Sequence, residues 1–241
     1  MARLVRHFIE APRQCSYLSS VQASLEYRLM VNVLPDELDT LLSRGWRRFG
    51  PAYFRPACRP CGECVSLRID ASRLEPTPSQ KRALKRTRRF RMEVGTPKVD
   101  AERLKLHALW HRTREDMRGW EPSALTEDEY ATQFAFPSNT GKELAFYDGD
   151  QLVGLSLLDV TPRAISAAYF FYHPSIARLS PGVGNVMRCL ELARELRARH
   201  VYLGYRVQGC DSLQYKGFFR PHELLDGRPG LDEPAVWKEV K

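Results

Sequence analysis

The chain has 241 residues, of which 43% are hydrophobic and 27% are charged, and its formal net charge is +8 at pH 7. This length can bury one large core or two modest ones, and the positive charge favours polyanionic partners such as nucleic acids. No run of about 18 apolar residues could span a membrane, and no apolar secretory signal is recognisable at residues 1–10. We therefore expect a cytoplasmic protein with reduced cysteines and no membrane partner.

The first third of the chain predicts short elements. Residues 23–32 favour an extended segment. A helix is predicted over residues 35–42, because a proline and two acidic residues suit its first turn and its leucines form an apolar stripe. Residues 65–69, with the sequence VSLRI, alternate like a strand.

Four cysteines in this part of the chain are candidate metal ligands. Cys58, Cys61 and Cys64 follow a C-x2-C-x2-C spacing, and Cys15 lies upstream. Thiolates separated by two residues can turn toward one centre, as they do in zinc knuckles and iron–sulfur loops. The spacing predicts an iron–sulfur or zinc site at these four residues, and reduced thiols that simply pack are the alternative.

A strongly basic helix is predicted after the prolines at positions 76 and 78. It carries many cations and no acidic residue before Glu93, whereas a merely solvated face would normally intersperse acids. We favour contact with nucleic acid over that alternative. The predicted contact residues are Lys81, Arg82, Lys85, Arg86, Arg88 and Arg89. The Gly95-Thr96-Pro97 segment then predicts a boundary between domains at residues 1–97 and 98–241.

The second part of the chain predicts two helices, over residues 102–117 and 127–134, followed by strands over 144–147, 152–160 and 165–172. Asp148-Gly149-Asp150 joins the first two strands and is a hairpin signal. A loop over 173–184, a helix over 185–199 and a strand over 201–207 complete the pattern. This order is that of the GNAT acyltransferase core. We predict an α+β fold, with a small cysteine-containing N-terminal domain and a GNAT-like domain whose mixed sheet is flanked by helices.

The loop before the predicted helix argues against coenzyme A. GNAT enzymes that use it hold its pyrophosphate on backbone N–H groups of an R/Q-x-x-G-x-G/A loop. Here Arg178 lies one residue too early, and Pro181 removes a donor. A coenzyme A-dependent N-acyltransferase is one alternative function, and a non-enzymatic RNA-binding protein with a zinc knuckle is another.

Two blocks of unusual motifs bracket most of the chain. The first block comprises Cys15-Ser16-Tyr17-Leu18, Gly45-Trp46-Arg47-Arg48-Phe49-Gly50, Phe54-Arg55-Pro56 and Leu67-Arg68-Ile69. The second comprises Tyr202-Leu203-Gly204-Tyr205-Arg206-Val207, Cys210, Tyr215-Lys216, Phe218 and Pro221-His222-Glu223. In this order the motifs resemble the arginyltransferase family of aminoacyl-tRNA–protein transferases, in its bacterial leucyl branch.

The resemblance implies an enzyme that transfers leucine from leucyl-tRNA to proteins with an N-terminal Asp or Glu, marking them for degradation by the N-end rule pathway. The implied chemistry is aminolysis of the aminoacyl ester, which runs downhill and requires no cofactor. Its partners would be leucyl-tRNA and the acidic acceptor protein. The residues alone are compatible with either leucine or arginine as the transferred group.

Candidate site residues lie mainly on the last predicted strand and the loop after it, because that end of a splayed GNAT sheet faces the acyl donor. Hydroxyl and amide groups there can orient the amine or relay its proton. The predicted catalytic residues are Tyr205, Gln208 and Tyr215. An acidic acceptor side chain requires a cation, and the motifs shared with the family imply that the substrate-binding residues are Arg206, Lys216 and Arg68.

Overall fold

The computed structural model describes residues 1–59, 61–118, 122 and 125–241. The strands are β1 (Arg3–Ile9), β2 (Arg13–Gln14), β3 (Gln22–Ala23), β4 (Leu25–Val31), β5 (Arg47–Phe49), β6 (Ala52–Pro56), β7 (Val65–Asp70), β8 (Arg91–Gly95), β9 (Gly141–Asp148), β10 (Gln151–Val160), β11 (Ala164–Tyr172), β12 (His200–Arg206), β13 (His222–Leu225) and β14 (Trp237–Val240). The helices are α1 (Pro35–Ser43), α2 (Pro78–Thr87), α3 (Ala101–Arg118), α4 (Glu127–Phe134), α5 (Pro181–Glu195) and α6 (Asp211–Gln214), with 3-10 turns η1 (Pro174–Leu179) and η2 (Tyr215–Phe218).

The strands form a small and a large sheet, and β2 and β3 form a separate two-stranded pair. The small sheet is antiparallel, in the order β1–β4–β6–β5, and α1 packs with it around the buried Trp46. The large sheet has the order β14–β13–β7–β12–β11–β10–β9–β8. Tyr202 of β12 belongs to the same apolar cluster as Trp46, so the small sheet is anchored to the large one.

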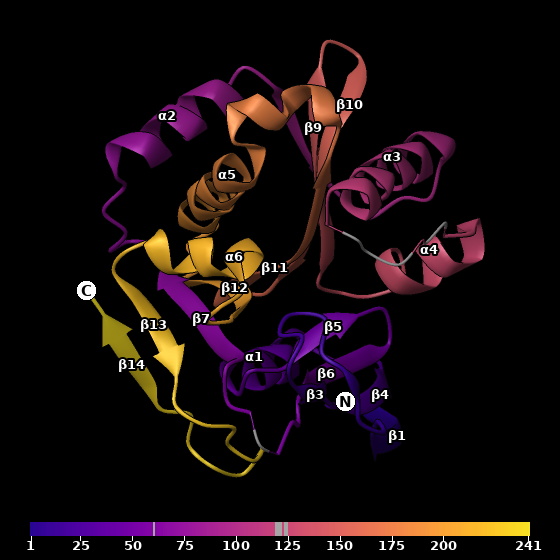
Figure 1. The fold of residues 1–241 in the computed structure, drawn as a ribbon, viewed down its shortest axis with the longest axis vertical. Helices are drawn as coiled ribbons and strands as arrows, with labels where there is room; N and C mark the ends of the chain where they lie inside the picture. Colours follow the sequence, from indigo (N-terminus) through magenta and orange to yellow (C-terminus); the bar gives the residue numbers. More distant parts are fainter. Residues whose placement is uncertain (60, 119–121, 123–124) are drawn as a thin grey trace.

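Helices cover both faces of the large sheet (Figure 1). On one face, Leu144 and Phe146 of β9 belong to a cluster that includes Val186 and Leu190 of α5. On the other face, Ala145 belongs to a cluster with residues of α3 and α4. Successive side chains of a strand point to opposite faces, so β9 contributes to both cores.

Strands from both parts of the sequence build the large sheet. β7 lies between β13 and β12 and is antiparallel to both, and β8 pairs with β9 at one edge. Helix α2 packs on α5, where a Cβ on Gly184 would lie 2.2 Å from Thr87. The sheet thus draws strands from both sides of residue 97, and the division into residues 1–97 and 98–241 stays a prediction.

The predicted α+β fold with a mixed sheet flanked by helices is confirmed. The order β9, β10, β11, α5, β12 is the GNAT-like core, including the hairpin at Gly149. The loop expected over residues 173–184 is wrong in part. It contains η1, and α5 already begins at Pro181, because proline suits the first helical turn. Within the described ranges, no helix has the length and apolar character needed to cross a bilayer.

Candidate active site

A cavity of about 530 Å³ opens where β11 and β12 diverge. The two strands pair in parallel only between residues 164–166 and 200–202. Residues of β5, β6, α3, the first half of α5, and the segment from α6 to η2 line the space beyond that pairing. This places the cavity at the splayed end of the sheet, where the acyl donor was expected.

Arg47, on β5, reaches into the gap between the diverging strands. Its Nη2 donates a hydrogen bond of 2.6 Å to the carbonyl of Ala167, the first β11 residue beyond the paired region. Gly204 of β12 has φ +78° and carries no side chain, so its backbone lies against the guanidinium; a Cβ there would be 3.4 Å from Arg47 Cζ. Arg47 is 7% exposed, and its Nη1 has no hydrogen-bond partner among the described residues.

Lys216, on η2, is the second cation of the cavity and is half-buried. Its Nζ donates to the carbonyl of Tyr205 at 3.1 Å. Burial, and then the positive charge of Arg47, lowers the pKa of Lys216 to about 7. Burial likewise lowers the pKa of Arg47. We call Arg47 and Lys216 the two-cation site. In the part of the chain that the structure describes, no ion pair joins either of them to a carboxylate.

The neighbouring Arg48 has a carboxylate partner. Its Nε donates to Asp159 Oδ1 at 3.0 Å, and Thr140 Oγ1 donates to the same oxygen at 2.9 Å. The side chains of Arg48 and Asp159 are 10% and 3% exposed. The charge of Asp159 also raises the pKa of Arg47, but less than burial lowers it. Asp159 is therefore committed to Arg48 and leaves Arg47 without a contact ion.

Aromatic side chains form the apolar wall of the cavity. Phe49 and Phe54 come from the small sheet, Tyr169 and Tyr172 from β11, and Trp110 from α3. Arg114 of α3 also lines the cavity, donating to the Tyr172 hydroxyl at 2.8 Å and lying over the Trp110 ring. Such a wall can bury a leucyl side chain, while the cations beside it can bind an anion.

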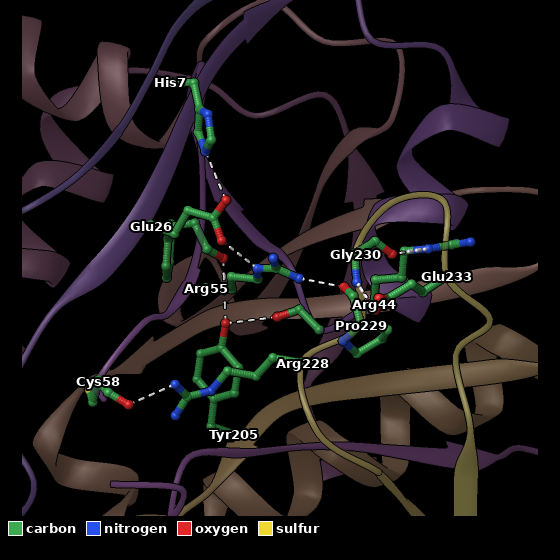
Figure 2. Close-up of polar contacts among 12 residues, drawn as sticks. His7, Glu26, Arg44, Arg55, Cys58, Tyr205, Arg228, Pro229, Gly230 and Glu233 are labelled. Carbon is green, nitrogen blue, oxygen red and sulfur yellow. Dashed lines mark hydrogen bonds and ion pairs between the residues drawn. The ribbon is translucent and has the colours of Figure 1, made fainter. Parts of the chain in front are cut away.

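The predicted catalytic residues occupy different surroundings. Tyr205 lines the cavity, but its hydroxyl donates to the carbonyls of Gly45 at 2.9 Å and Phe54 at 3.4 Å (Figure 2). Burial raises its pKa, so it is no base near neutral pH. Tyr215 also lines the cavity, whereas Gln208 is exposed and lies outside the lining.

Two of the predicted substrate-binding cations are outside the cavity lining. Arg68 Nε donates to Glu223 Oε2 at 2.6 Å, and its guanidinium lies over the Trp237 ring. Arg206 lies beside Gly217, and its Nε is buried without a hydrogen-bond partner among the described residues. Only Lys216 of the three predicted cations lines the cavity.

The four predicted metal ligands are neighbours, but within the described residues they are not arranged as a metal site. Burial, followed by the charges of Cys58, Cys15 and Cys61, raises the pKa of Cys64 to about 12. The other three thiols therefore lie close enough to Cys64 to act on it. Arg228 donates to the carbonyls of Cys58 at 2.9 Å and Cys61 at 2.7 Å (Figure 2 shows the former). Over the described ranges, no three His, Cys, Asp or Glu side chains are arranged to hold a metal. The geometry gives no support to the predicted iron–sulfur or zinc site.

The basic helix α2 presents its cations to solvent. All six predicted tRNA-binding residues on or beside it are exposed. Arg88 is paired with Glu191 and Arg89 with Asp148. For the other four, Lys81, Arg82, Lys85 and Arg86, no ion pair occurs within the described ranges. The C-terminal end of α2 contacts Gly184 of α5, and Gly182 in the same helical turn lines the cavity.

Sequence reasoning missed Arg47, Trp110 and Arg114 as cavity residues. Arg47 lies in the GWRRFG motif, which was a possible signal for a functional residue. The motif does not indicate which of Arg47 and Arg48 lines the cavity. Trp110 and Arg114 lie four residues apart on one face of α3. That spacing is equally typical of a helix that only packs on the sheet.

The chain matches the family description "Arginine-tRNA-protein transferase, N terminus" over residues 13–82 and "Arginine-tRNA-protein transferase, C terminus" over residues 102–226. It is 34% identical over 228 residues to an aspartate/glutamate leucyltransferase of Campylobacter jejuni, covering 94% of this chain and 95% of that one. The corresponding enzyme of Helicobacter hepaticus is 31% identical over 237 residues, with 98% of both chains covered. Among solved structures, L-PGS from Bacillus licheniformis is 10% identical with a TM-score of 0.47, over 73% of this chain and 58% of that one.

Proposed function

The chain belongs to the arginine-tRNA-protein transferase family, and we propose that it transfers leucine from leucyl-tRNA to the N-terminal Asp or Glu of proteins, marking them for degradation. The observation that carries this proposal is identity above 30% to aspartate/glutamate leucyltransferases over nearly the whole length of both chains. A cavity with an apolar wall and two cations fits a leucyl group and an acidic acceptor. A tRNA substrate and free cysteines both fit a cytoplasmic reaction.

The proposed reaction needs no group beyond its two substrates. The neutral α-amino nitrogen of the acceptor attacks the ester carbonyl carbon of leucyl-tRNA and forms an amide bond. The bond from that carbon to the ribose oxygen breaks, the amine loses one proton, and the ribose oxygen gains one. An α-amino group has a pKa of about 7.7–8.0, so a useful fraction is neutral near pH 7.5. The protein must mainly orient the substrates and stabilise the transient oxyanion.

Tyr215 and Lys216 are our candidates for contact with the substrates from the predicted set. Both lie on η2 and line the cavity. Of the remaining predicted catalytic residues, Tyr205 is engaged by backbone carbonyls and Gln208 lies outside the lining. Burial raises the pKa of Tyr215 as well, so we propose that its neutral hydroxyl relays a proton, and we propose an anchoring role for the Tyr205 hydroxyl.

The donor tRNA is proposed to approach along α2. Its exposed cations suit a phosphate backbone, and the same helix ends against the turn of α5 that lines the cavity. A paired acceptor stem is A-form, so contacts should fall on the backbone and 2′-hydroxyls rather than on bases. This path would carry the esterified end of the tRNA from α2 into the cavity.

Transfer of labelled leucine from leucyl-tRNA to peptides that begin with Asp, Glu or Ala tests the function. We expect transfer to the Asp and Glu peptides only. Acetyl transfer from acetyl-coenzyme A to the same peptides would instead support an N-acyltransferase, and tRNA binding without transfer would support an RNA-binding protein. Either result would overturn the proposal.

The tRNA path is tested by replacing Arg82 and Arg86 together with Ala, because neither has an ion-pair partner within the described ranges. We expect weaker binding of all tRNA species and a salt slope reduced by roughly 0.7–0.9 for each lost contact. Arg163→Ala is the control, since that exposed arginine pairs with Asp36 far from α2 in sequence. An unchanged salt slope in the double variant would mean that the cations of α2 are only solvated and do not contact the tRNA.

A further inference from the structure

Arg47 is a buried cation whose charge the protein does not neutralise by contact. Its neighbour Arg48 has Asp159, while the hydrogen-bond partner of Arg47 is the neutral carbonyl of Ala167. Taking a charge out of water is costly unless it is paired. Gly204 and Ala167 hold the guanidinium in place from two strands, so the arrangement is a fixed one. A fixed, buried and unneutralised cation at a cavity indicates an anionic ligand.

Lys216 strengthens this indication, because it brings a second positive charge into the same cavity. Burial and the positive charge of Arg47 lower the pKa of Lys216, so the two side chains are close enough to interact. The unpartnered Nη1 of Arg47 and the Nζ of Lys216 are donors that an anion can accept from. A carboxylate has two oxygens and can accept from both groups at once.

We propose that Arg47, acting with Lys216, is the specificity-determining residue that binds the side-chain carboxylate of the acceptor's first residue. This inference rests on the proposed function. The Arg47 side chain is 7% exposed and its Nη1 is buried, so the site suits a small anion such as the carboxylate at the tip of an Asp or Glu side chain. A tRNA phosphate is bulkier and already has a solvent-exposed basic surface on α2. The aromatic wall beside the two-cation site is left for the leucyl group.

The test compares matched peptides that begin with Asp or Asn, which differ in charge but hardly in shape. We measure kcat/KM for leucyl transfer to each, with wild-type protein and with Arg47→Gln. Wild type should prefer the Asp peptide. Arg47→Gln should lower kcat/KM for the Asp peptide about ten- to a hundredfold, the range expected for a lost charge-assisted hydrogen bond. The KM for leucyl-tRNA should stay within about twofold, because such a contact acts on the acceptor alone.

Arg55→Gln is the matched control. Arg55 lies on β6 of the same small sheet, but its Nε donates to Glu26 and its Nη1 to the Pro229 carbonyl, so it has acceptors within the protein. We expect the control to keep the wild-type preference for Asp over Asn. If Arg47→Gln does not fold, Arg47→Lys is measured instead. It keeps the charge but loses the planar fork, and its preference should still fall.

Three results would overturn the inference. One is a wild-type Asp preference retained in Arg47→Gln, or in Arg47→Lys where that variant replaces it. Another is a raised KM for leucyl-tRNA with the acceptor preference kept, which would assign Arg47 to a phosphate. The third comes from calorimetry with the dipeptides Asp-Ala and Asn-Ala, which needs no tRNA: equal binding of both by wild type. If wild type binds Asp-Ala better but transfers no leucine, the proposed function fails while the binding site stands.

Discussion

Two groups of basic residues border the small sheet, and they differ in whether the protein supplies their acceptors. In the outer group, Arg55 joins Glu26 to the Pro229 carbonyl, Arg44 donates to Gly230, and Arg228 donates to Cys58 (Figure 2). In the inner group, Arg47 and Lys216 donate to neutral backbone carbonyls and border a cavity.

Cations with acceptors in the protein stabilise contacts between segments, whereas cations without a contact carboxylate at a cavity are available to bind a ligand. Arg44, Arg55 and Arg228 tie the segment after β13 to the small sheet and to the cysteine loop across large sequence distances. Removing one of them should loosen a contact between segments. The two-cation site donates to neutral carbonyls and has no contact carboxylate among the described residues, so its charge is a cost to the unliganded protein. Its retention is understandable if a substrate carboxylate completes it.

The largest expected effect separates Arg47 from its neighbour. Asp159→Ala leaves Arg48 buried without its partner and should lower the free energy of unfolding by about 3–5 kcal/mol. Arg47→Gln removes a buried charge that has no ion-pair partner, so the lost hydrogen bond is offset by relieved desolvation and the change should stay below about 1 kcal/mol. Urea denaturation of both variants gives the two values. Equal losses would mean that Arg47 is a structural residue.

Lys216 should give the cavity a pH response. It is charged below its pKa of about 7 and neutral above it, so binding of an acceptor carboxylate weakens as pH rises. The acceptor amine needs the opposite change, losing its proton at about 7.7–8.0. For wild type, kcat/KM with an Asp peptide should therefore be bell-shaped, falling at the alkaline end toward the value of a protein without a charge at Lys216.

Lys216→Met is the variant that checks this assignment. Its kcat/KM should be lower but should rise to a plateau above pH 8, without the alkaline fall. The other groups that act on Lys216 are Arg47, Cys210 and Cys64. An alkaline limb that persists in Lys216→Met would show that a group other than Lys216 causes it.

The smallest expected effect comes from Tyr205→Phe. The hydroxyl bonds two backbone carbonyls of the small sheet region, Gly45 and Phe54, so its loss should cost about 0.5–1.5 kcal/mol of stability. Leucyl transfer should remain near the wild-type rate because the hydroxyl is already engaged. A large loss of kcat at unchanged stability would instead support the predicted catalytic role of Tyr205.

Local patterns predicted the GNAT-like core well. The hairpin at Gly149 followed from its turn residues, and β9 and β10 pair antiparallel on either side of it. The start of α5 at Pro181 was misplaced, because glycines and prolines signal both loops and first turns. The insertion of β7 between β12 and β13 joins residues far apart in sequence, and no local pattern encodes such a pairing.

The sequence predicted where the site lies and that it needs cations, but it did not predict which residues line the cavity. Lys216 was predicted from a motif shared with the family, and it lines the cavity. Arg47 was not, because what sets it apart is the absence of a carboxylate, and Asp159 lies 111 residues away from Arg48 in sequence. The cysteine spacing predicted nearness, and the four thiols are neighbours. Spacing alone does not fix whether thiols converge on one point.

A crystal structure of the protein with the dipeptide Asp-Ala bound tests the two-cation site most directly. The side-chain carboxylate should lie within about 3.2 Å of both Arg47 Nη1 and Lys216 Nζ, the limit for a hydrogen bond of this kind. A carboxylate held instead by Arg114 or Arg206, with Arg47 Nη1 still unbonded, would contradict the assignment.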